Sequence, residues 1–119
     1  MPLDPNAVPG LLRALDDPDV YVRITAAEAL GKIGNPVAIA RLLEILDDGR
    51  PPVRRRVIGA LERIGTEPKA RAAAQVVPGL ERGLYDSDPV VRAAAERALQ
   101  RLGISSAQAA LARWRTSGL

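Results

Sequence analysis

Apolar residues recur along this chain every three or four positions, which is the spacing of amphipathic helices. In one stretch Val22, Ala26, Leu30 and Ile33 share a face, and turns rich in Asp, Pro or Gly separate such stretches. The pattern predicts an all-α chain with helices at 7–15, 18–33, 36–46, 52–64, 68–84, 89–102 and 106–115. Pro78 falls inside the fifth range, where it predicts a kink or a restart.

The helices follow an internal repeat whose landmarks are a Val-Arg pair, an Ala-Leu pair and a closing Gly. Val22-Arg23 recurs 31 residues later as Val53-Arg54 and a further 38 residues later as Val91-Arg92, and the other landmarks keep both steps. The repeats occupy about 6–34, 35–65 and 66–103. No partner helix follows the helix at about 105–115, so we expect it to cap the C-terminal end.

Polar residues and glycines predict where the helices begin and end. Side chains that favour N-cap positions precede many of the helices, often with a proline in the first turn. The expected caps are Asn6, Asp17, Asn35, Thr66, Asp88 and the Ser105-Ser106 pair. Gly34, Gly65 and Gly103 are expected to end the second helix of each repeat.

The repeated pattern D-x-x-x-x-V-R-x-x-A-x-x-A-L-x-x-I/L-G resembles HEAT-like repeats of the short bacterial and archaeal type. Similar repeats occur in phycobilin lyases and in consensus-designed helical repeat proteins. This chain departs from the pattern at Val57, which replaces a small Ala, at Gly59 inside the second helix of repeat two, and in an expanded connection after Gly65. These departures favour a natural array over a pure consensus design.

The resemblance implies an α-solenoid of stacked antiparallel helical hairpins, a HEAT-like superhelix. In such folds the first helix of each hairpin (the A helix) lines the convex side and the second (the B helix) lines the concave side. The physical argument agrees, because one hairpin cannot bury its own apolar face and each repeat needs a wall from its neighbour.

The arginines of the Val-Arg pairs are the first candidate group. Each follows an acidic turn, and a planar guanidinium bridges carboxylates and loop carbonyls well. We therefore favour a structural clamp between repeats, as the resemblance also implies, over a basic ladder for a ligand. The clamp residues are Arg23, Arg54, Arg92, Asp17, Asp48 and Asp86.

The outward face of the B helices is the second candidate group. Positions 21, 25, 28 and 32 share a face opposite the core, and the resemblance places that face in the concave surface. The expected partner-binding residues are Tyr21, Thr25, Lys32, Pro52, Arg56, Arg63, Val90, Arg97 and Arg101. Compensation of helix-end carbonyls explains Lys32, Arg63 and Arg101 equally well, whereas Arg56 and Arg97 lie mid-helix.

The two ends of the array are the third candidate. Trp114 and Leu111 are expected to cap the third hairpin, with an exposed pairing patch as the alternative. The N-terminal end has no dedicated capping helix. We therefore expect weak self-association, or membership of a larger array, through Leu11, Leu12 and Leu15 or through Trp114.

Composition narrows the chemistry. The 119 residues, 26% of them charged and 47% hydrophobic, fit one globular domain with a formal charge of +3. Cys and His are absent, which removes disulfides, thiolate metal sites and the commonest general base. No metal or cofactor is expected, because helix caps account for Asp16, Asp17, Asp86 and Asp88. With no signal peptide or membrane-spanning run, the expected location is the cytoplasm.

The sequence therefore predicts a protein that is not an enzyme, a scaffold that binds an acidic protein or peptide on its basic concave surface. A nucleic-acid-binding module is the weaker alternative, since the net charge is small and no aromatic stacking platform is present. An accessory lyase or chaperone-type role, such as bilin attachment, rests on family analogy. A purely structural design scaffold also stays open.

Overall fold

The computed structural model describes residues 4–69 and 71–118, and over these residues it is all helical with no strand. The elements are η1 (Pro5–Ala7), α1 (Val8–Ala14), α2 (Val20–Ile33), η2 (Pro36–Ala38), α3 (Ile39–Ile45), α4 (Pro51–Thr66), α5 (Ala73–Gly83), α6 (Pro89–Leu102) and α7 (Ser105–Arg115). The all-α prediction is confirmed. Within this described part no helix is both long and apolar enough to cross a membrane.

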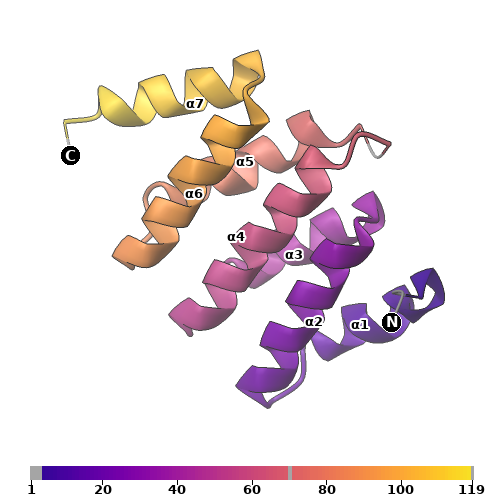
Figure 1. Cartoon of the computed structure of the whole chain (residues 1–119). Coiled ribbons are helices and arrows are strands. Elements are labelled where there is room, and N and C mark those ends of the chain that lie inside the picture. Colours follow the sequence, from indigo (N-terminus) through magenta and orange to yellow (C-terminus); the bar gives the residue numbers. More distant parts are fainter. Residues whose placement is uncertain (1–3, 70, 119) are drawn as a thin grey trace.

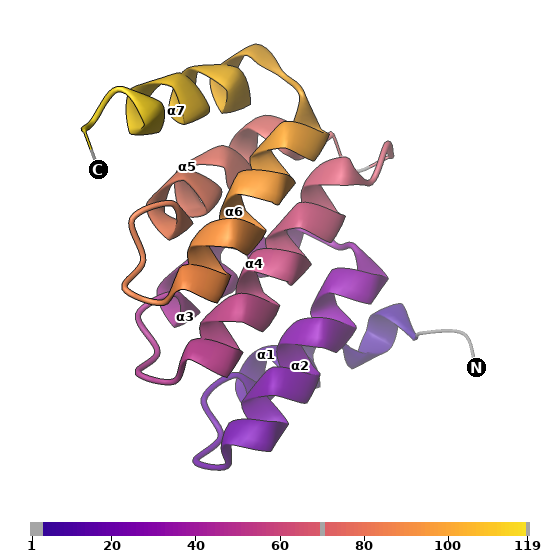
Figure 2. The ribbon, with the colours of Figure 1, turned by 60° about the vertical axis from the view of Figure 1, so that its left-hand side comes forward.

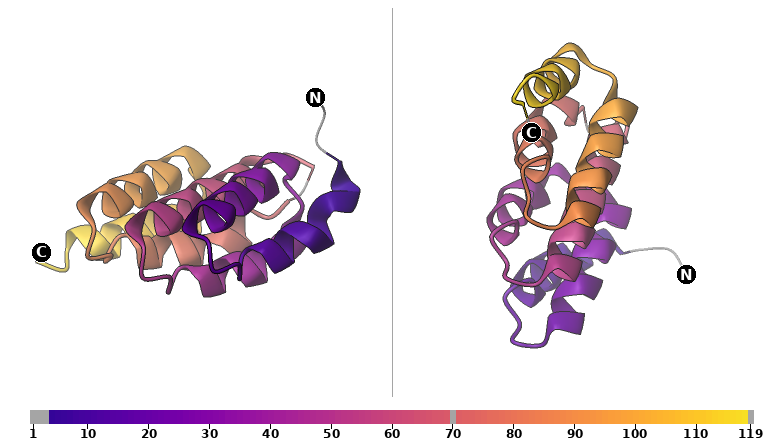
Figure 3. Two further views of the ribbon diagram at one scale, coloured as in Figure 1. Left: turned by 90° about the horizontal axis from the view of Figure 1, so that it is seen from below. Right: turned by 90° about the vertical axis from the view of Figure 1, so that its left-hand side faces the viewer.

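The helices form two layers (Figure 1). The B helices α2, α4 and α6 lie side by side in one layer, and α1, α3 and α5 lie behind them in the other, as Figure 2 shows. Seen from below, α7 continues the layer of the A helices beyond α5 (Figure 3), and it packs against both α5 and α6. This stack of helical hairpins is the predicted α-solenoid.

The core lies between the two layers and consists of aliphatic side chains. Its largest fully buried members include Leu30, Leu42, Leu61, Leu80 and Leu99. No polar or charged residue is buried in the described part of the chain. No aromatic ring is among the buried core residues of the described chain. The small residues Gly31 and Ala60 let the B helices α2 and α4 approach each other closely.

Glycines in this structure serve two different purposes. Gly34 and Gly103 end α2 and α6 in the left-handed region, with φ of 75° and 64°, as predicted. The prediction that Gly65 also ends its helix is wrong, since α4 continues to Thr66. A Cβ on Gly65 would lie 2.5 Å from Val76 Cγ2, so this glycine instead lets the expanded connection and α5 pack against α4.

Several expected helix starts also differ from the structure. Asp19, two residues later than the expected Asp17, caps α2 by accepting a hydrogen bond from the Tyr21 N–H, while Asp17 accepts one from the Asp19 N–H inside the turn. The first helix is preceded by a 3-10 turn in which Asp4, and not Asn6, is the cap. Asn35 caps its 3-10 turn as predicted.

The third repeat and the last helix depart most from the prediction. Helix α5 begins at Ala73 and not at 68, because Arg71 has a φ of 50° that a helix does not accommodate. Thr66 is the last residue of α4 and donates to the Glu62 carbonyl, so it caps nothing. Asp88 and Ile104 occupy N-cap positions without a side-chain capping bond, and Ser105 is already helical.

The two ends of the stack differ in polarity. At the N-terminal end Val22 and Ala29 are partly exposed, whereas the equivalent residues of α4 and α6 are buried. At the other end the outer face of α6 carries Glu96 and Gln100, and Trp114 is partly buried against the core. Leu15 is fully buried, so an association through this residue is excluded.

Close approach of α2 and α4 leads to the first testable prediction. A Cβ on Gly31 would lie 2.8 Å from the Ala60 Cα, a backbone atom that cannot rotate away, whereas a Cβ on Gly59 would meet nothing within 4 Å. We expect Gly31→Ala to lower the free energy of unfolding by about 1–3 kcal/mol through overpacking. The matched Gly59→Ala should raise it by roughly 0.5–1 kcal/mol. Urea denaturation measures both, and a stabilised Gly31→Ala variant would contradict the packing described here.

Candidate binding groove

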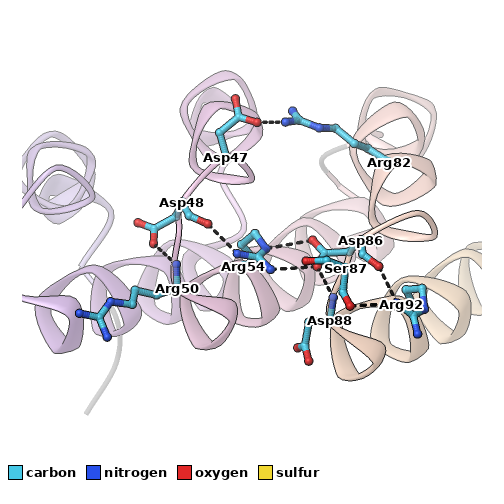
Figure 4. A network of polar contacts seen from close by, with 9 residues as sticks. All are labelled: Asp47, Asp48, Arg50, Arg54, Arg82, Asp86, Ser87, Asp88 and Arg92. Carbon is cyan, nitrogen blue, oxygen red and sulfur yellow. Dashed lines mark hydrogen bonds and ion pairs between the residues drawn. The ribbon is translucent and has the colours of Figure 1, made fainter.

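The arginine at the start of α4 joins two repeats (Figure 4). Arg54 Nη1 donates to the Asp48 carbonyl at 2.8 Å, inside its own turn, while Nε and Nη2 donate to the two carboxylate oxygens of Asp86 at 2.9 and 3.0 Å. The two side chains are only 11% and 13% exposed. A bidentate, charge-assisted pair with this little solvent is much stronger than an exposed one.

The equivalent arginines make the same contact less completely. Arg23 Nη1 donates to the Asp17 carbonyl at 2.9 Å, and its Nε lies 2.8 Å from Asp48 Oδ2 without the alignment of a hydrogen bond. Arg92 Nη1 donates to the Asp86 carbonyl at 2.7 Å but has no carboxylate partner in residues 4–69 and 71–118. Each arginine thus takes a carbonyl from its own turn and, where a following turn exists, a carboxylate from it.

We call the contacts of Arg23, Arg54 and Arg92 with these acidic turns the ladder. Its aspartates also accept hydrogen bonds within their own turns. Asp48 accepts a hydrogen bond from the Arg50 N–H and Asp86 accepts one from the Asp88 N–H, both at 2.8 Å. Burial raises the pKa of Asp86, but the hydrogen bonds from Arg54 and from the Asp88 backbone outweigh it and hold the pKa below its ordinary value. The same pairing raises the pKa of Arg54.

A second set of ion pairs lies on the side of the A helices. Arg41 contacts Asp16, and Arg82 contacts Asp47 of the preceding turn (Figure 4 shows the second pair). The carboxylates of these pairs are 64% and 71% exposed. Exposed pairs contribute little to stability, so the ladder on the B-helix side is the more important one.

The outer surface of the B helices is hollowed. Two adjoining hollows of about 470 and 540 Å³ share Arg55, Arg56, Gly59, Glu62 and Arg101, and together they extend over α2, α4 and α6. We call this continuous hollow the B-helix groove. Its remaining lining residues are Ile24, Glu28, Lys32, Pro52, Ile58, Ala60, Arg63, Val90, Ala94 and Arg97.

Most of the residues predicted to bind a partner line this groove: Lys32, Pro52, Arg56, Arg63, Val90, Arg97 and Arg101. Tyr21 and Thr25 do not. They border a separate apolar hollow near Leu11 and Val22, and the Thr25 hydroxyl donates to the Tyr21 carbonyl. Tyr21 belongs to the first repeat and borders a hollow that α2 forms with α1, whereas Pro52 and Val90 at the equivalent positions line the groove.

The charges of the groove are only partly compensated. Arg56 pairs with Glu28 at 3.0 Å and Arg101 pairs with Glu62 at 3.2 Å, each across two B helices. Lys32, Arg55, Arg63 and Arg97 line the same groove and have no ion pair among the described residues. The lining therefore carries six cationic side chains and two carboxylates, both of which are already engaged.

Arg55 is the cationic residue of the groove that the sequence analysis missed. Its Nε is buried and has no hydrogen-bond partner within the described chain. The equivalent positions of the other repeats hold Ile24 and Ala93, so the alignment of the repeats shows no recurring cation at this position. The run Arg54-Arg55-Arg56 was the available signal, because three successive arginines on a helix cannot all face the same side.

No group of three or more carboxylates that would hold a metal ion occurs in the described residues. The acidic residues of the turns are instead used as hydrogen-bond acceptors and ion-pair partners. With six cationic side chains and two engaged carboxylates in its lining, the groove is suited to hold anionic groups.

Comparison with known proteins places this architecture in a family. The chain matches the family described as HEAT repeats over residues 3–62 and again over 39–118. Because these matches cover nearly the whole sequence, the chain belongs to the HEAT-repeat family, as its repeat pattern predicted.

Three curated relatives have names that state an activity, whereas the family match gives only the type of repeat. Deoxyhypusine hydroxylase of Eremothecium gossypii is 36% identical over 91 residues, which is 75% of this chain and 26% of the relative. Phycocyanobilin lyase subunit alpha of Nostoc sp. is 32% identical over 106 residues, 82% of this chain and 37% of the relative. The subunit of that name from Picosynechococcus sp. is 31% identical over 105 residues, 81% of this chain and 38% of the relative. The chain therefore spans well under half the length of each.

These relatives correct one prediction. The sequence analysis expected no enzyme, because His and Cys are absent and no catalytic arrangement is visible. The relatives are named as a hydroxylase and as lyase subunits, which points to an enzymatic or lyase-type function. The prediction rested on the residue types of this chain alone, which include no His or Cys.

The ladder gives the second prediction. Arg54→Ala should lower the free energy of unfolding by about 1–3 kcal/mol, because it leaves the half-buried Asp86 without its charged donor. Arg92→Ala removes the same side chain where no carboxylate is paired, so its effect should be smaller than that of Arg54→Ala. Chemical denaturation at neutral pH compares the two, and equal losses would show that the carboxylate contact is unimportant.

The third prediction concerns acid. The pKa of Asp86 and that of Glu81, which accepts two hydrogen bonds from Arg113, are lowered by folding. Carboxyl groups whose pKa is lowered by folding stabilise the folded state at pH values above their unfolded pKa of about 4. This stabilisation is lost as the pH falls through the pKa of the folded state. The free energy of unfolding should thus hold steady from about pH 7 to pH 5 and decrease below about pH 4.

Arg54→Ala tests the source of this acid dependence. Without Arg54 the pKa of Asp86 is no longer lowered by its ion pair, so the acid decrease should become shallower. Arg97→Ala, a groove arginine without an ion pair, serves as the control and should keep the slope of the parent chain. An unchanged slope in Arg54→Ala would assign the acid dependence to other groups.

Proposed function

We propose that this chain is the substrate-holding part of a lyase-type enzyme and that the B-helix groove binds carboxylate groups of the substrate. The observation that carries the proposal is the uncompensated positive charge of the groove, from Lys32, Arg55, Arg63 and Arg97 beside two engaged carboxylates. Arginine forks match the planar geometry of a carboxylate. An acidic protein partner and a small carboxylate ligand share this chemistry.

The names of the curated relatives offer a lyase-type and a hydroxylase-type function, and the groove favours one of them. Phycocyanobilin is a linear tetrapyrrole with two propionate carboxylates, and both lyase subunits match a larger share of this chain than the hydroxylase does. Deoxyhypusine carries a cationic amine, which a groove with a surplus of cations repels. The chemistry of the groove therefore favours the lyase-type function over the hydroxylase type.

The groove also has apolar walls. Ile24, Pro52, Val90 and Ala94 line it beside the arginines, and Val90 is 49% exposed. A ligand with an apolar body and carboxylate arms meets both kinds of surface, whereas a bare phosphate backbone uses only the charge. This supports a carboxylate-bearing substrate more than a nucleic acid.

Charge reversal provides the fourth prediction. Arg63→Glu together with Arg97→Glu should weaken phycocyanobilin binding at least tenfold, since two uncompensated cations are replaced by anions. The free energy of unfolding should stay within about 0.5 kcal/mol, because neither side chain is buried or paired in the described structure. Absorbance and fluorescence titration of phycocyanobilin measures the affinity.

The control is Arg13→Glu with Arg50→Glu, which makes the same change in net charge at exposed sites outside the groove. The control should bind like the parent chain, and phycocyanobilin dimethyl ester, whose carboxylates are blocked, should bind weakly to all of them. An acidic protein that binds while phycocyanobilin does not would locate the carboxylates on a macromolecule. Equal loss in both double variants, or binding to DNA or RNA that falls steeply between two salt concentrations, would overturn the proposal.

A further inference from the structure

Gly59 occupies the middle of α4, where glycine weakens a helix relative to alanine. Neither packing nor conformation accounts for it. A Cβ at Gly59 would meet nothing within 4 Å, whereas a Cβ at Gly31, Gly65 or Gly83 would come within 2.8 Å of a neighbour. Its backbone is also outside the left-handed region that favours glycine. The folded chain by itself therefore gives no reason for the missing side chain.

The position of Gly59 in the groove supplies a reason. Gly59 lines both hollows, which share only four other residues. The repeat places Glu28 and Arg97 at the equivalent positions of α2 and α6, and a side chain of that size on α4 would stand between the two hollows. The glycine thus joins them into one groove and leaves the backbone of α4 open to whatever lies there.

Arg55 lies one helical turn before Gly59, so both face the same side of α4. It lines both hollows, and its buried Nε has no partner in the described residues. The neighbouring carboxylates are engaged elsewhere, Glu28 by Arg56 and Glu62 by Arg101. The guanidinium of Arg55 thus lines the groove with no ion pair among the described residues.

We infer that Arg55 and Gly59 form a carboxylate anchor at the centre of the B-helix groove. A ligand carboxylate accepts a hydrogen bond from Arg55 and rests against the bare backbone at Gly59. The body of the ligand then extends into both hollows, where Arg63 of α4 and Arg97 of α6 add positive charge. The anchor selects an elongated small molecule that bears more than one carboxylate.

This inference rests on the proposed function and sharpens its substrate class. A linear tetrapyrrole of the phycocyanobilin kind carries two propionates, one on each of its two inner rings. One propionate pairs with Arg55, and the other meets a further groove cation such as Arg63 or Arg97. The apolar residues Ile24, Pro52, Val90 and Ala94, which line one of the two hollows, face the rings.

The test uses the full chain with phycocyanobilin as the probe, titrated by absorbance. Gly59→Leu should raise the Kd roughly 10- to 100-fold because its side chain divides the groove, while the melting temperature stays level or rises, since leucine favours a helix more than glycine does. Ala93→Leu adds the same side chain at an exposed position of α6 outside the groove and should leave the Kd unchanged.

Arg55→Lys and Arg55→Gln separate the hydrogen bond from the charge. Lysine keeps the charge but lacks the planar fork of a guanidinium, so both variants should raise the Kd for phycocyanobilin, again by roughly 10- to 100-fold for a lost charge-assisted bond. Neither should change the weak binding of the dimethyl ester. If Arg55→Lys binds like the parent chain, the guanidinium of Arg55 is not the anchor.

The outcomes distinguish this inference from the proposed function. If the parent chain binds phycocyanobilin and Arg63→Glu with Arg97→Glu weakens it, but Gly59→Leu and Arg55→Lys do not, the function stands and the anchor is wrong. If Gly59→Leu weakens only a synthetic Glu-Gly peptide and leaves the tetrapyrrole unaffected, the anchor takes peptides and the substrate class is wrong. If the parent chain binds no tetrapyrrole, both proposals fail.

Discussion

The structure depends on a contact between repeats, in which the arginine at the start of a B helix holds the aspartate of the following turn. Arg54 shows it most completely, because one edge of its guanidinium takes the Asp48 carbonyl and the other takes both carboxylate oxygens of Asp86. A rigid planar fork that is fixed at both edges sets the spacing and the rotation of two hairpins at once. Apolar packing holds the hairpins together but specifies their relative position less narrowly.

The groove follows from that spacing. It is formed by side chains of three parallel B helices, so its width is the distance at which the ladder and the small residues hold them. Gly31 lets α2 approach Ala60 of α4 closely, and the ion pair between Arg56 and Glu28 then bridges the same two helices from outside. The result is a hollow surface with an excess of positive charge and a floor that carries no side chain at Gly59.

The ladder lacks a partner at both ends of the stack, and the two ends differ in how far apolar side chains are covered. Asp17 receives no arginine and Arg92 receives no carboxylate within the described residues. Polar residues cover the outer face of α6, where Glu96 contacts Arg115 of α7 at 3.8 Å. At the N-terminal end of the stack Val22 stays partly exposed within the described residues, whereas the equivalent Val53 and Val91 are buried.

The sequence by itself determined the architecture, because the apolar stripes of the helices and the offsets of the Val-Arg pairs depend only on local periodicity. It also singled out Arg54 and Asp86, although not that they pair with each other, since that pairing spans 32 residues and is set by stacking. Gly34 ends its helix, whereas the equivalent Gly65 lies inside α4 and packs against Val76. Only the tertiary structure decided this difference. It alone revealed the orphaned Nε of Arg55, because burial in a groove depends on side chains from three helices that no single stretch of sequence contains.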